Sequence, residues 1–401
     1  MCTAPGSTWR SATTCTSATR TGSPAPRPDQ RSPEGSMSVA VQAEDHRTTD
    51  VIGAAAADIA EGASALPTFR THGLLEMAAT GTEGTETADP RTVLYAIEEI
   101  AYADGSAGWL LAAAQSARLL HWAPQAVREE VTAGAFVTGS PSPEGRIEAD
   151  GHAYRISGRW AGVPGAAEAE WFALPVWSGE VPTAVLLPAE AVRLGSATAG
   201  IGLDGAGCRD VHVDEAAVPT ARVIDPFGPP PSSGGYSGTL PFAAAGRQAA
   251  VAVALGLARR ALYEFASAAR HRSRLGSVSR MAEQPLMRRD LNRVVQGFRA
   301  GRELLLAETA RIIDSTGTPA GIPRGTRANL AAAQLHAQQA AHEAVRFAFT
   351  KAGGSALYIG HPLESRWRDS ETVGQQWVFG QVTERQVTNA QFGDYVPQFV
   401  L

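Results

Sequence analysis

The spacing of apolar residues changes twice along the chain, and each change marks a different kind of structure. Over residues 49–134 apolar side chains recur every three to four positions, as Val93 and Ile97 do, which is the spacing of a helix face. Pro90 occupies a favoured first position for one of these helices, and Gly105 interrupts the pattern. Helices are predicted over residues 50–60, 65–78, 90–104 and 109–120.

A shorter period replaces the helical one between residues 135 and 227. Short runs rich in aromatic and β-branched residues are separated there by glycine and proline, and Val211 and Val213 alternate with polar neighbours as in a half-buried strand. Strands are predicted over residues 154–160, 171–177, 184–187 and 211–213. This part of the chain is therefore expected to form an all-β domain.

The helical spacing returns beyond a linker rich in proline, glycine and serine at 226–238. Long helices are predicted over residues 251–265, 285–305, 326–351 and 371–389. Because they are long and joined by short turns, they indicate an antiparallel bundle. The predicted fold is α+β, with an N-terminal helical domain at 49–134, a central β-barrel or sandwich domain at 135–227 and a C-terminal four-helix bundle at 228–401.

Composition excludes several classes of protein. The formal net charge is −5, so the sequence shows no basic surface for nucleic acid, and no uninterrupted apolar stretch has the length of a membrane span. Only Cys208 among the three cysteines lies in the patterned part, and the histidines show no closely spaced pair. Neither a disulfide framework nor a metal site is expected.

Residues 1–48 differ from the rest of the chain. They are rich in Ser, Thr, Pro, Gly and Arg, lack the apolar core of a secretory signal, and contain a second methionine, Met37. We expect a disordered leader, part of which lies upstream of the true start. With so few cysteines, the expected compartment is the cytoplasm.

Four short motifs follow one another along the patterned part. Residues 103–109 read A-D-G-S-A-G-W, residues 151–160 read G-H-A-Y-R-I-S-G-R-W, residues 202–211 read G-L-D-G-A-G-C-R-D-V, and residues 366–369 read R-W-R-D after a Gly353-Gly354 pair. In this order, with the change from helix to strand and back, they resemble the acyl-CoA dehydrogenase superfamily. Within it they resemble the two-component flavin-dependent monooxygenases of natural-product pathways. The resemblance covers the chain from about Val51 onward and implies the acyl-CoA dehydrogenase fold.

The resemblance implies a flavin in a cleft between the β domain and the bundle. Trp160 would then pack on the edge of the flavin ring, and main-chain groups of Gly139 and Ser140 would bind its pyrimidine side. Pro164 lies in the segment where the family has a hydroxyl residue beside the ring. The expected cofactor is reduced, diffusible FAD or FMN, with no cofactor as the alternative. Trp160 also has a purely structural interpretation as a packing residue.

A second group of residues is implied in binding the flavin phosphates. Gly353 and Gly354 allow the backbone to approach a phosphate closely. Arg272 and Arg274 occupy positions from which family members reach the flavin phosphates of a neighbouring subunit. The alternative is that both arginines lie on a solvated helix end.

The sequence departs from the family at the catalytic positions. Trp377 stands where acyl-CoA dehydrogenases carry a glutamate base, and the surrounding Gln375-Gln376 stretch lacks the histidine common in the related monooxygenases. The candidate catalytic residues are therefore Gln376, which could orient the substrate by hydrogen bonds, Trp377, and Glu371 as a proton acceptor. A first-turn helix acid is the structural alternative for Glu371. The substrate pocket is expected to be lined by Trp109, His121 and Ala206.

These residues leave several functions open. The leading hypothesis is a monooxygenase that takes reduced flavin from a separate flavin reductase and oxygenates a small natural-product intermediate. The alternatives are a cyclase, dehydratase or isomerase that works without flavin, a flavin dehydrogenase or oxidase with a relocated base, and a non-catalytic scaffold subunit. A homotetramer or homodimer is implied by the resemblance, and no nucleic-acid or membrane partner is expected.

Overall fold

Capping residues set the limits of the N-terminal helices. The computed structural model describes residues 46–77, 88–227, 240–274, 276–315, 322–397 and 400. Helix α3 (Pro90–Ala103) starts at Pro90, and its N-cap Asp89 accepts a hydrogen bond of 2.7 Å from the amide of Arg91. Asp104 then caps α4 (Gly105–Ala114) by accepting a 2.8 Å hydrogen bond from the amide of Ala107. The predicted interruption at Gly105 is confirmed.

The other N-terminal helices depart from the predicted ranges: the first starts earlier, the second ends earlier and the third was not predicted. They are α1 (His46–Ala60), α2 (Ala65–Thr71) and α5 (Gln125–Glu130). The predicted helix at 65–78 ends at Thr71 because Gly73 adopts a φ of +66°, and the one at 109–120 continues beyond Ala114 as the 3₁₀ turn Gln115–His121. Helix α1 begins inside the predicted leader; residues 1–45 lie outside the described part.

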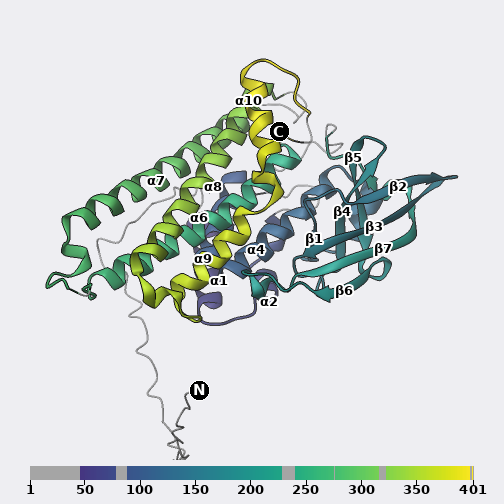
Figure 1. Ribbon diagram of the computed structural model, residues 1–401. Coiled ribbons are helices and arrows are strands. Elements are labelled where there is room, and N and C mark those ends of the chain that lie inside the picture. Colours follow the sequence, from purple (N-terminus) through teal and green to yellow (C-terminus); the bar gives the residue numbers. More distant parts are fainter. Residues whose placement is uncertain are drawn as a thin grey trace, which may run out of the picture. The chain divides into compact units, whose positions relative to one another are not determined.

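The strands form one eight-stranded sheet within the described residues. They are β1 (Val137–Gly139), β2 (Gly145–Asp150), β3 (Ala153–Val163), β4 (Trp171–Ser178), β5 (Val181–Pro188), β6 (Arg193–Ala197), β7 (Arg209–Pro219) and β8 (Val223–Ile224). Their order is β6-β7-β3-β2-β4-β5-β8, and β1 pairs with β4. The pairings of β1 and β2 with β4 are parallel, whereas all the others are antiparallel. Figure 1 shows this sheet to one side of the helices.

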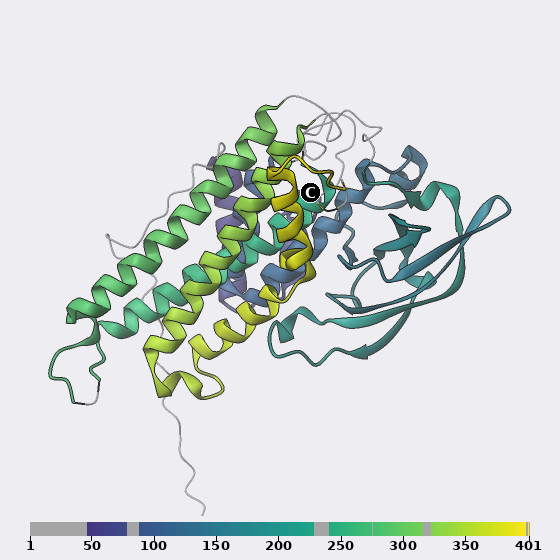
Figure 2. The ribbon, with the colours of Figure 1, turned by 45° about the horizontal axis from the view of Figure 1, so that its top comes forward.

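The C-terminal helices lie side by side in both views of the molecule (Figures 1 and 2). They are α6 (Phe242–Ala269), α7 (Pro285–Asp314), α8 (Arg324–Ala352), α9 (Pro362–Gly374) and α10 (Gln381–Gln391). Helix α6 is buried along most of its length and packs against α3, α4, α8 and α9, so it is the central element of the helical part. Gly353 ends α8 with a φ of +79°, as predicted.

The single last helix predicted over 371–389 is wrong. The structure has two helices there, α9 and α10, separated by the 3₁₀ turn Trp377–Phe379. Helix α9 begins already at Pro362, a favoured first residue, and the low helix propensity of Gly374 and Gly380 allows the chain to leave the helix between them. The turn lies where the helices meet the sheet, at the edge of a cavity that Trp377 and Val378 line.

Candidate active site

A cavity of about 570 Å³ lies between the sheet, α4, α6 and the end of α9. Its volume is within the range of about 300–1,000 Å³ that is usual for small-molecule sites. The sheet contributes mainly small or cyclic residues, among them Gly139, Ala161, Pro164 and Ala173. The opposite wall carries larger side chains. They include Trp109, Gln115, Arg118, Arg247, Gln376 and Trp377.

Three of the sequence motifs meet at one edge of this cavity. The amide of Leu203 donates a 2.7 Å hydrogen bond to the Oδ1 atom of Asp369. Two residues along, the amide of Gly205 donates to the hydroxyl of Ser106 at 3.2 Å. The loop after β6 is thus attached both to α9 and to the start of α4, and it brings Gly202, Leu203 and Asp204 into the cavity wall.

This loop approaches α9 so closely that it needs a glycine. A Cβ atom on Gly202 would lie 2.5 Å from the carbonyl oxygen of Arg368, a distance that no side chain tolerates. Leu203 follows in the left-handed region with a φ of +59°, which is strained for a leucine. The Arg368 guanidinium completes the attachment, because it donates to the carbonyl of Ile201 at 2.6 Å and pairs with Asp204 at 3.2 Å.

The carboxyl group of Asp369 is buried at this junction. Burial raises its pKa above the ordinary value, while the hydrogen bond from Leu203 acts in the opposite direction. The nearest cation is Arg366, whose Nη1 atom lies 3.9 Å from Oδ2. Asp369 therefore acts as a hydrogen-bond acceptor for the loop, and it does not line the cavity within the described structure.

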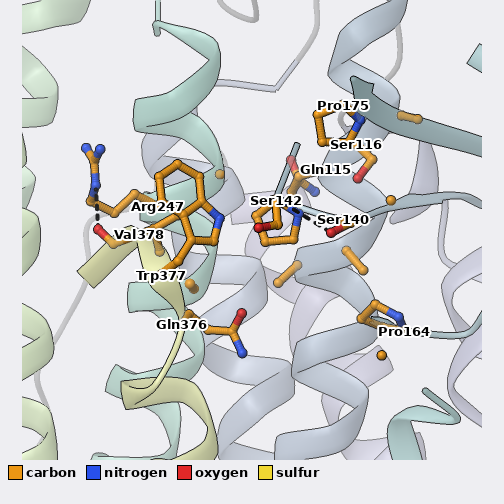
Figure 3. A pocket seen from close by; sticks show the side chains of 18 of the residues that line it. Gln115, Ser116, Ser140, Ser142, Pro164, Pro175, Arg247, Gln376, Trp377 and Val378 are labelled. Carbon is orange, nitrogen blue, oxygen red and sulfur yellow. Dashed lines mark hydrogen bonds between the residues drawn. The ribbon is translucent and has the colours of Figure 1, made fainter. Parts of the chain in front are cut away.

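The turn after α9 supplies the candidate catalytic residues. Gln376 and Trp377 both line the cavity, and Figure 3 shows them on one side with Pro164 and Ser140 on the other. Because the helix stops at Gly374, the side chain of Gln376 leaves the helical path and faces the sheet. Trp377 remains 38% exposed, so it covers the cavity from the solvent side.

Arg247 on α6 holds this turn in place, and sequence reasoning missed it. Its Nε atom donates to the carbonyl of Val378 at 3.3 Å, Nη1 donates to Oε1 of Gln334 at 2.9 Å, and Nη2 donates to the carbonyl of Val400. The side chain is almost fully buried, and this burial lowers the pKa of the guanidinium to about 10. Its position one helical turn before Val251, on an otherwise apolar face, was an available signal.

The sheet wall of the cavity includes three residues predicted to contact a flavin. Gly139 and Ser140 lie at the end of β1, and Pro164 follows β3. The hydroxyl of Thr138 donates a 2.6 Å hydrogen bond to the carbonyl of Pro164, which fixes that segment against β1. Gly139 is required at its position, because a Cβ atom there would lie 2.3 Å from the carbonyl oxygen of Ala173 on β4. Trp109, predicted for the substrate pocket, lines the helical side.

Other predicted residues lie near the cavity without lining it. Trp160 is fully buried inside the sheet domain and donates its indole N–H to the carbonyl of Pro175 at 3.0 Å. The carbonyl of Ala206 accepts a 2.8 Å hydrogen bond from the amide of Gly165. His121 is buried with its ring edge-on to Trp122.

Glu371 lies in the last turn of α9, so its interpretation as a first-turn acid is wrong; the helix starts nine residues earlier than the sequence indicated. Its carboxylate lies 3.7 Å from Nε2 of His342 on α8, and it is not among the residues that line the cavity. Burial lowers the pKa of His342, and the Glu371 carboxylate partly offsets that effect.

The residues predicted to bind phosphates lie at the other end of the bundle. Arg272 donates to the hydroxyl of Ser355 at 2.9 Å, and Arg274 donates to the carbonyl of Lys351 at 3.3 Å, so both arginines are beside Gly353 and Gly354. Helix α6 lines the cavity only as far as Ala250 and ends at Ala269. At 1.5 Å per residue, these two positions are about 28 Å apart. The residues predicted to bind the flavin phosphates are therefore remote from this chain's own cavity.

Comparison with known proteins agrees with this architecture. Residues 248–380 match the family described as acyl-CoA dehydrogenase, C-terminal domain. Indole-3-acetate monooxygenase of Pseudomonas putida is 24% identical over 333 residues, which are 81% of this chain and 85% of the relative. The FADH₂-dependent resorcinol hydroxylase oxygenase component of Rhizobium sp. is 26% identical over 75% of this chain and 80% of the relative. The homologues are thus flavin-dependent monooxygenases.

Solved structures show the same fold. The 3-HSA hydroxylase of Rhodococcus sp. RHA1 superposes with a TM-score of 0.79 at 19% identity, covering 89% of this chain and 100% of that one. XiaF of Streptomyces sp., solved with FADH₂ and glycerol, gives 0.74 at 17% identity and covers 88% of this chain and 95% of that one. Butyryl-CoA dehydrogenase of Megasphaera elsdenii gives 0.71 at 15% identity over 87% and 98% of the two chains.

Proposed function

We propose that this protein, a member of the acyl-CoA dehydrogenase superfamily, is the oxygenase component of a flavin-dependent monooxygenase and receives reduced flavin from a separate reductase. The observation that carries the proposal is the helix-side wall of the cavity. Gln376 and Trp377 face the cavity there, whereas Glu371, the base that a dehydrogenase or oxidase would need, pairs with His342 outside it. The homology to monooxygenases supports the same conclusion.

The residues present fit a flavin ring. The sheet wall is made of Gly139, Ser140, Ala161 and Pro164, whose small or cyclic side chains leave the main chain accessible to a planar ring. When bound, a reduced flavin supplies the electrons that activate molecular oxygen for insertion into the substrate. The relatives named for FADH₂ favour FAD over FMN.

The protein's own contribution is to exclude water and to position the substrate. Trp109 and Trp377 cover the cavity with apolar surface, which protects reactive species from hydrolysis. The Gln376 amide can turn toward a substrate, because its hydrogen bond to the carbonyl of Thr372 is long at 3.4 Å. No proton acceptor is needed from Glu371 in this scheme.

The position of the residues predicted to bind the flavin phosphates supports an oligomer. Since Arg272, Arg274, Gly353 and Gly354 are remote from the cavity of their own chain, they would bind a flavin only if it belonged to a second copy. Exposed apolar side chains lie in the segment that follows. They are Leu357, Tyr358 and Ile359. A homotetramer or homodimer would cover this surface.

The substrate is proposed to be a small aromatic intermediate of natural-product metabolism. The named relatives act on indole-3-acetate and resorcinol, both of them compact aromatic molecules. Within the described residues, no helix is both long and apolar enough to cross a bilayer. We propose the cytoplasm as the compartment, where a reductase can supply reduced flavin.

Anaerobic titration with reduced FAD and reduced FMN tests the function. Binding in the micromolar range or tighter is expected for one of them, followed by oxygen-dependent product formation when a reductase is added. Gln376→Leu should lower product formation at unchanged flavin affinity, and the exposed Arg385→Gln should change neither quantity. Absence of flavin binding, with turnover in the absence of oxygen, would instead favour a cyclase, dehydratase or isomerase.

A further inference from the structure

Gln115 presents a buried hydrogen-bond acceptor that nothing in the described protein satisfies. The residue is only 5% exposed, and its Nε2 atom donates to the carbonyl of Leu111 one turn earlier at 3.4 Å. This bond identifies the other amide atom as Oε1, which has no hydrogen-bond partner among the described residues. A buried acceptor without a partner costs about 1–3 kcal/mol, so such atoms usually have a ligand or water as partner.

The cavity is the side from which that partner can reach Gln115. The Oε1 atom is closed off from solvent in the present side-chain conformation, and it becomes accessible when the amide turns, which its long 3.4 Å bond to Leu111 permits. Gln115 lines it at the point where α4 gives way to the 3₁₀ turn, and Figure 3 shows its amide among the cavity side chains, in the region of Ser116 and Ser142. A separate hollow on another side of Gln115 measures only about 10 Å³. That is at the lower limit for a single water molecule, whereas the cavity accommodates a whole small molecule.

The surrounding charges restrict the chemistry of the partner. Arg118 and Arg247 line the same cavity and are both almost fully buried. The lining carboxylates of Glu144 and Asp204, in contrast, are exposed to solvent. A cationic donor would therefore be repelled at the buried end of the cavity. The partner that fits Oε1 is a neutral N–H or O–H group on an otherwise apolar molecule.

We propose that Gln115 is a specificity-determining residue whose Oε1 atom accepts a hydrogen bond from a neutral N–H or O–H group of the substrate. This inference rests on the proposed function only in placing the substrate in this cavity. According to this inference, Gln115 makes the site prefer a ring that bears an N–H or O–H group, such as an indole or a phenol. The same ring with a methyl group in place of the N–H or O–H hydrogen would bind more weakly. A site built around a hydrogen bond discriminates strongly against an analogue that cannot form it.

The test compares the binding of indole and 1-methylindole by the full-length protein. Wild type should bind indole about tenfold more tightly than 1-methylindole, as expected for one buried hydrogen bond. In Gln115→Met, which has a similar volume and no comparable acceptor, the ratio should fall to about one. Gln115→Glu keeps an acceptor and should keep the preference. The steric effect of the methyl group enters the ratio of every variant, so the change in the ratio from wild type to Gln115→Met reports the hydrogen bond.

Two controls separate this inference from the proposed function. Thr198→Val removes a hydroxyl from an exposed part of the same cavity and should leave the indole preference intact. The affinity for reduced flavin is measured in every variant and should not change. An equal ratio in wild type and Gln115→Met, a loss of flavin affinity with the ratio unchanged, or no binding of either indole by wild type would each overturn the proposal.

Discussion

The Oδ1 atom of Asp369 on α9 accepts a 2.7 Å hydrogen bond from the amide of Leu203, which lies 166 positions earlier in the chain. The bond holds a strained loop residue, with a φ of +59°, against a helix in the C-terminal part. The same loop supplies part of the cavity wall. One carboxylate thereby couples the geometry of the sheet domain to that of α9, which ends in the turn carrying Gln376 and Trp377.

Removal of this acceptor should loosen the loop. Asp369→Ala leaves the buried amide of Leu203 without a partner, and we expect the free energy of unfolding to fall by about 1–3 kcal/mol. Asp369→Asn retains an oxygen acceptor and should stay within about 1 kcal/mol of wild type at neutral pH. Urea unfolding measures both values. Equal losses in the two variants would contradict the assigned hydrogen bond.

The raised pKa of Asp369 predicts a pH dependence of stability. Since burial favours the neutral form in the folded protein, the folded state keeps a proton that the unfolded chain releases above its own pKa of about 3.9. Stability relative to Asp369→Asn should therefore fall as the pH rises from about 4 through the folded pKa, and become constant above it. Unfolding curves from pH 4 to pH 8 measure the difference. A difference that increases with pH would contradict the shift.

The sequence predicted the limits of the helices before the sheet domain well where local chemistry decides them. Pro90 and Gly105 are recognisable as helix limits because first-turn prolines and interrupting glycines act within a few residues, whereas the cap Asp104 was found only in the structure. Contacts between segments far apart in the sequence were harder to predict. Neither the hydrogen bond from Leu203 to Asp369 nor the bonds of Arg247 to Val378 and Gln334 have a local signature, because they join segments far apart in the chain.

At the candidate site, too, some features could be predicted from the sequence and others could not. Gln376, Trp377, Trp109, Gly139, Ser140 and Pro164 line the cavity, and their roles in catalysis and flavin binding stay predictions. Trp160 was expected beside the flavin, but its indole is enclosed by the sheet, where Gly145 and Gly158 leave room for it. Glu371 was misjudged because the start of α9 at Pro362 depends on a weak helical pattern, which apolar spacing alone does not reveal.

Arg247 should determine the position of the turn over the cavity. Arg247→Met removes the donors to the carbonyls of Val378 and Val400, and leaves those acceptors buried and unpaired. We expect a loss of about 2–4 kcal/mol in stability. Limited proteolysis should also cleave the region after Gly374 faster. Arg385→Gln, on the exposed face of α10, is the control. An unchanged cleavage pattern would mean that the turn is held by other contacts.

Breaking the buried ion pair of Glu98 and Arg302 should destabilise the protein strongly, whereas replacing both residues by apolar ones should destabilise it less. Arg302 Nε donates to Glu98 Oε2 at 2.9 Å, and both side chains are at most 1% exposed. Glu98→Ala removes the buried partner of Arg302 and leaves it only the exposed carboxylate of Glu303 at 3.6 Å, so it should cost about 3–5 kcal/mol. The double variant Glu98→Leu/Arg302→Met should lose less than the single variant, because neither charge then remains. Urea unfolding distinguishes these outcomes.

An exposed pair provides the comparison for this prediction. The Nη1 atom of Arg293 lies 2.9 Å from Oε1 of Glu343, and most of both side chains is exposed to solvent. Glu343→Ala should change stability by no more than about 1 kcal/mol, because solvent screens the pair. If it cost as much as Glu98→Ala, burial would not be the cause of the larger effect.

Gly139 should be indispensable for the sheet wall of the cavity. It pairs with Ala173 across the parallel strands β1 and β4, and a Cβ atom there would lie 2.3 Å from that residue's carbonyl oxygen. Gly139→Ala must displace β1, so we expect a loss of about 1–3 kcal/mol in stability together with weaker binding of reduced flavin. The matched control is Gly297→Ala on α7, where nothing lies within 4 Å of the added methyl group. Alanine's better helix propensity should stabilise that variant by about 1 kcal/mol. Unchanged flavin affinity in Gly139→Ala, despite the loss of stability, would show that flavin does not contact this wall.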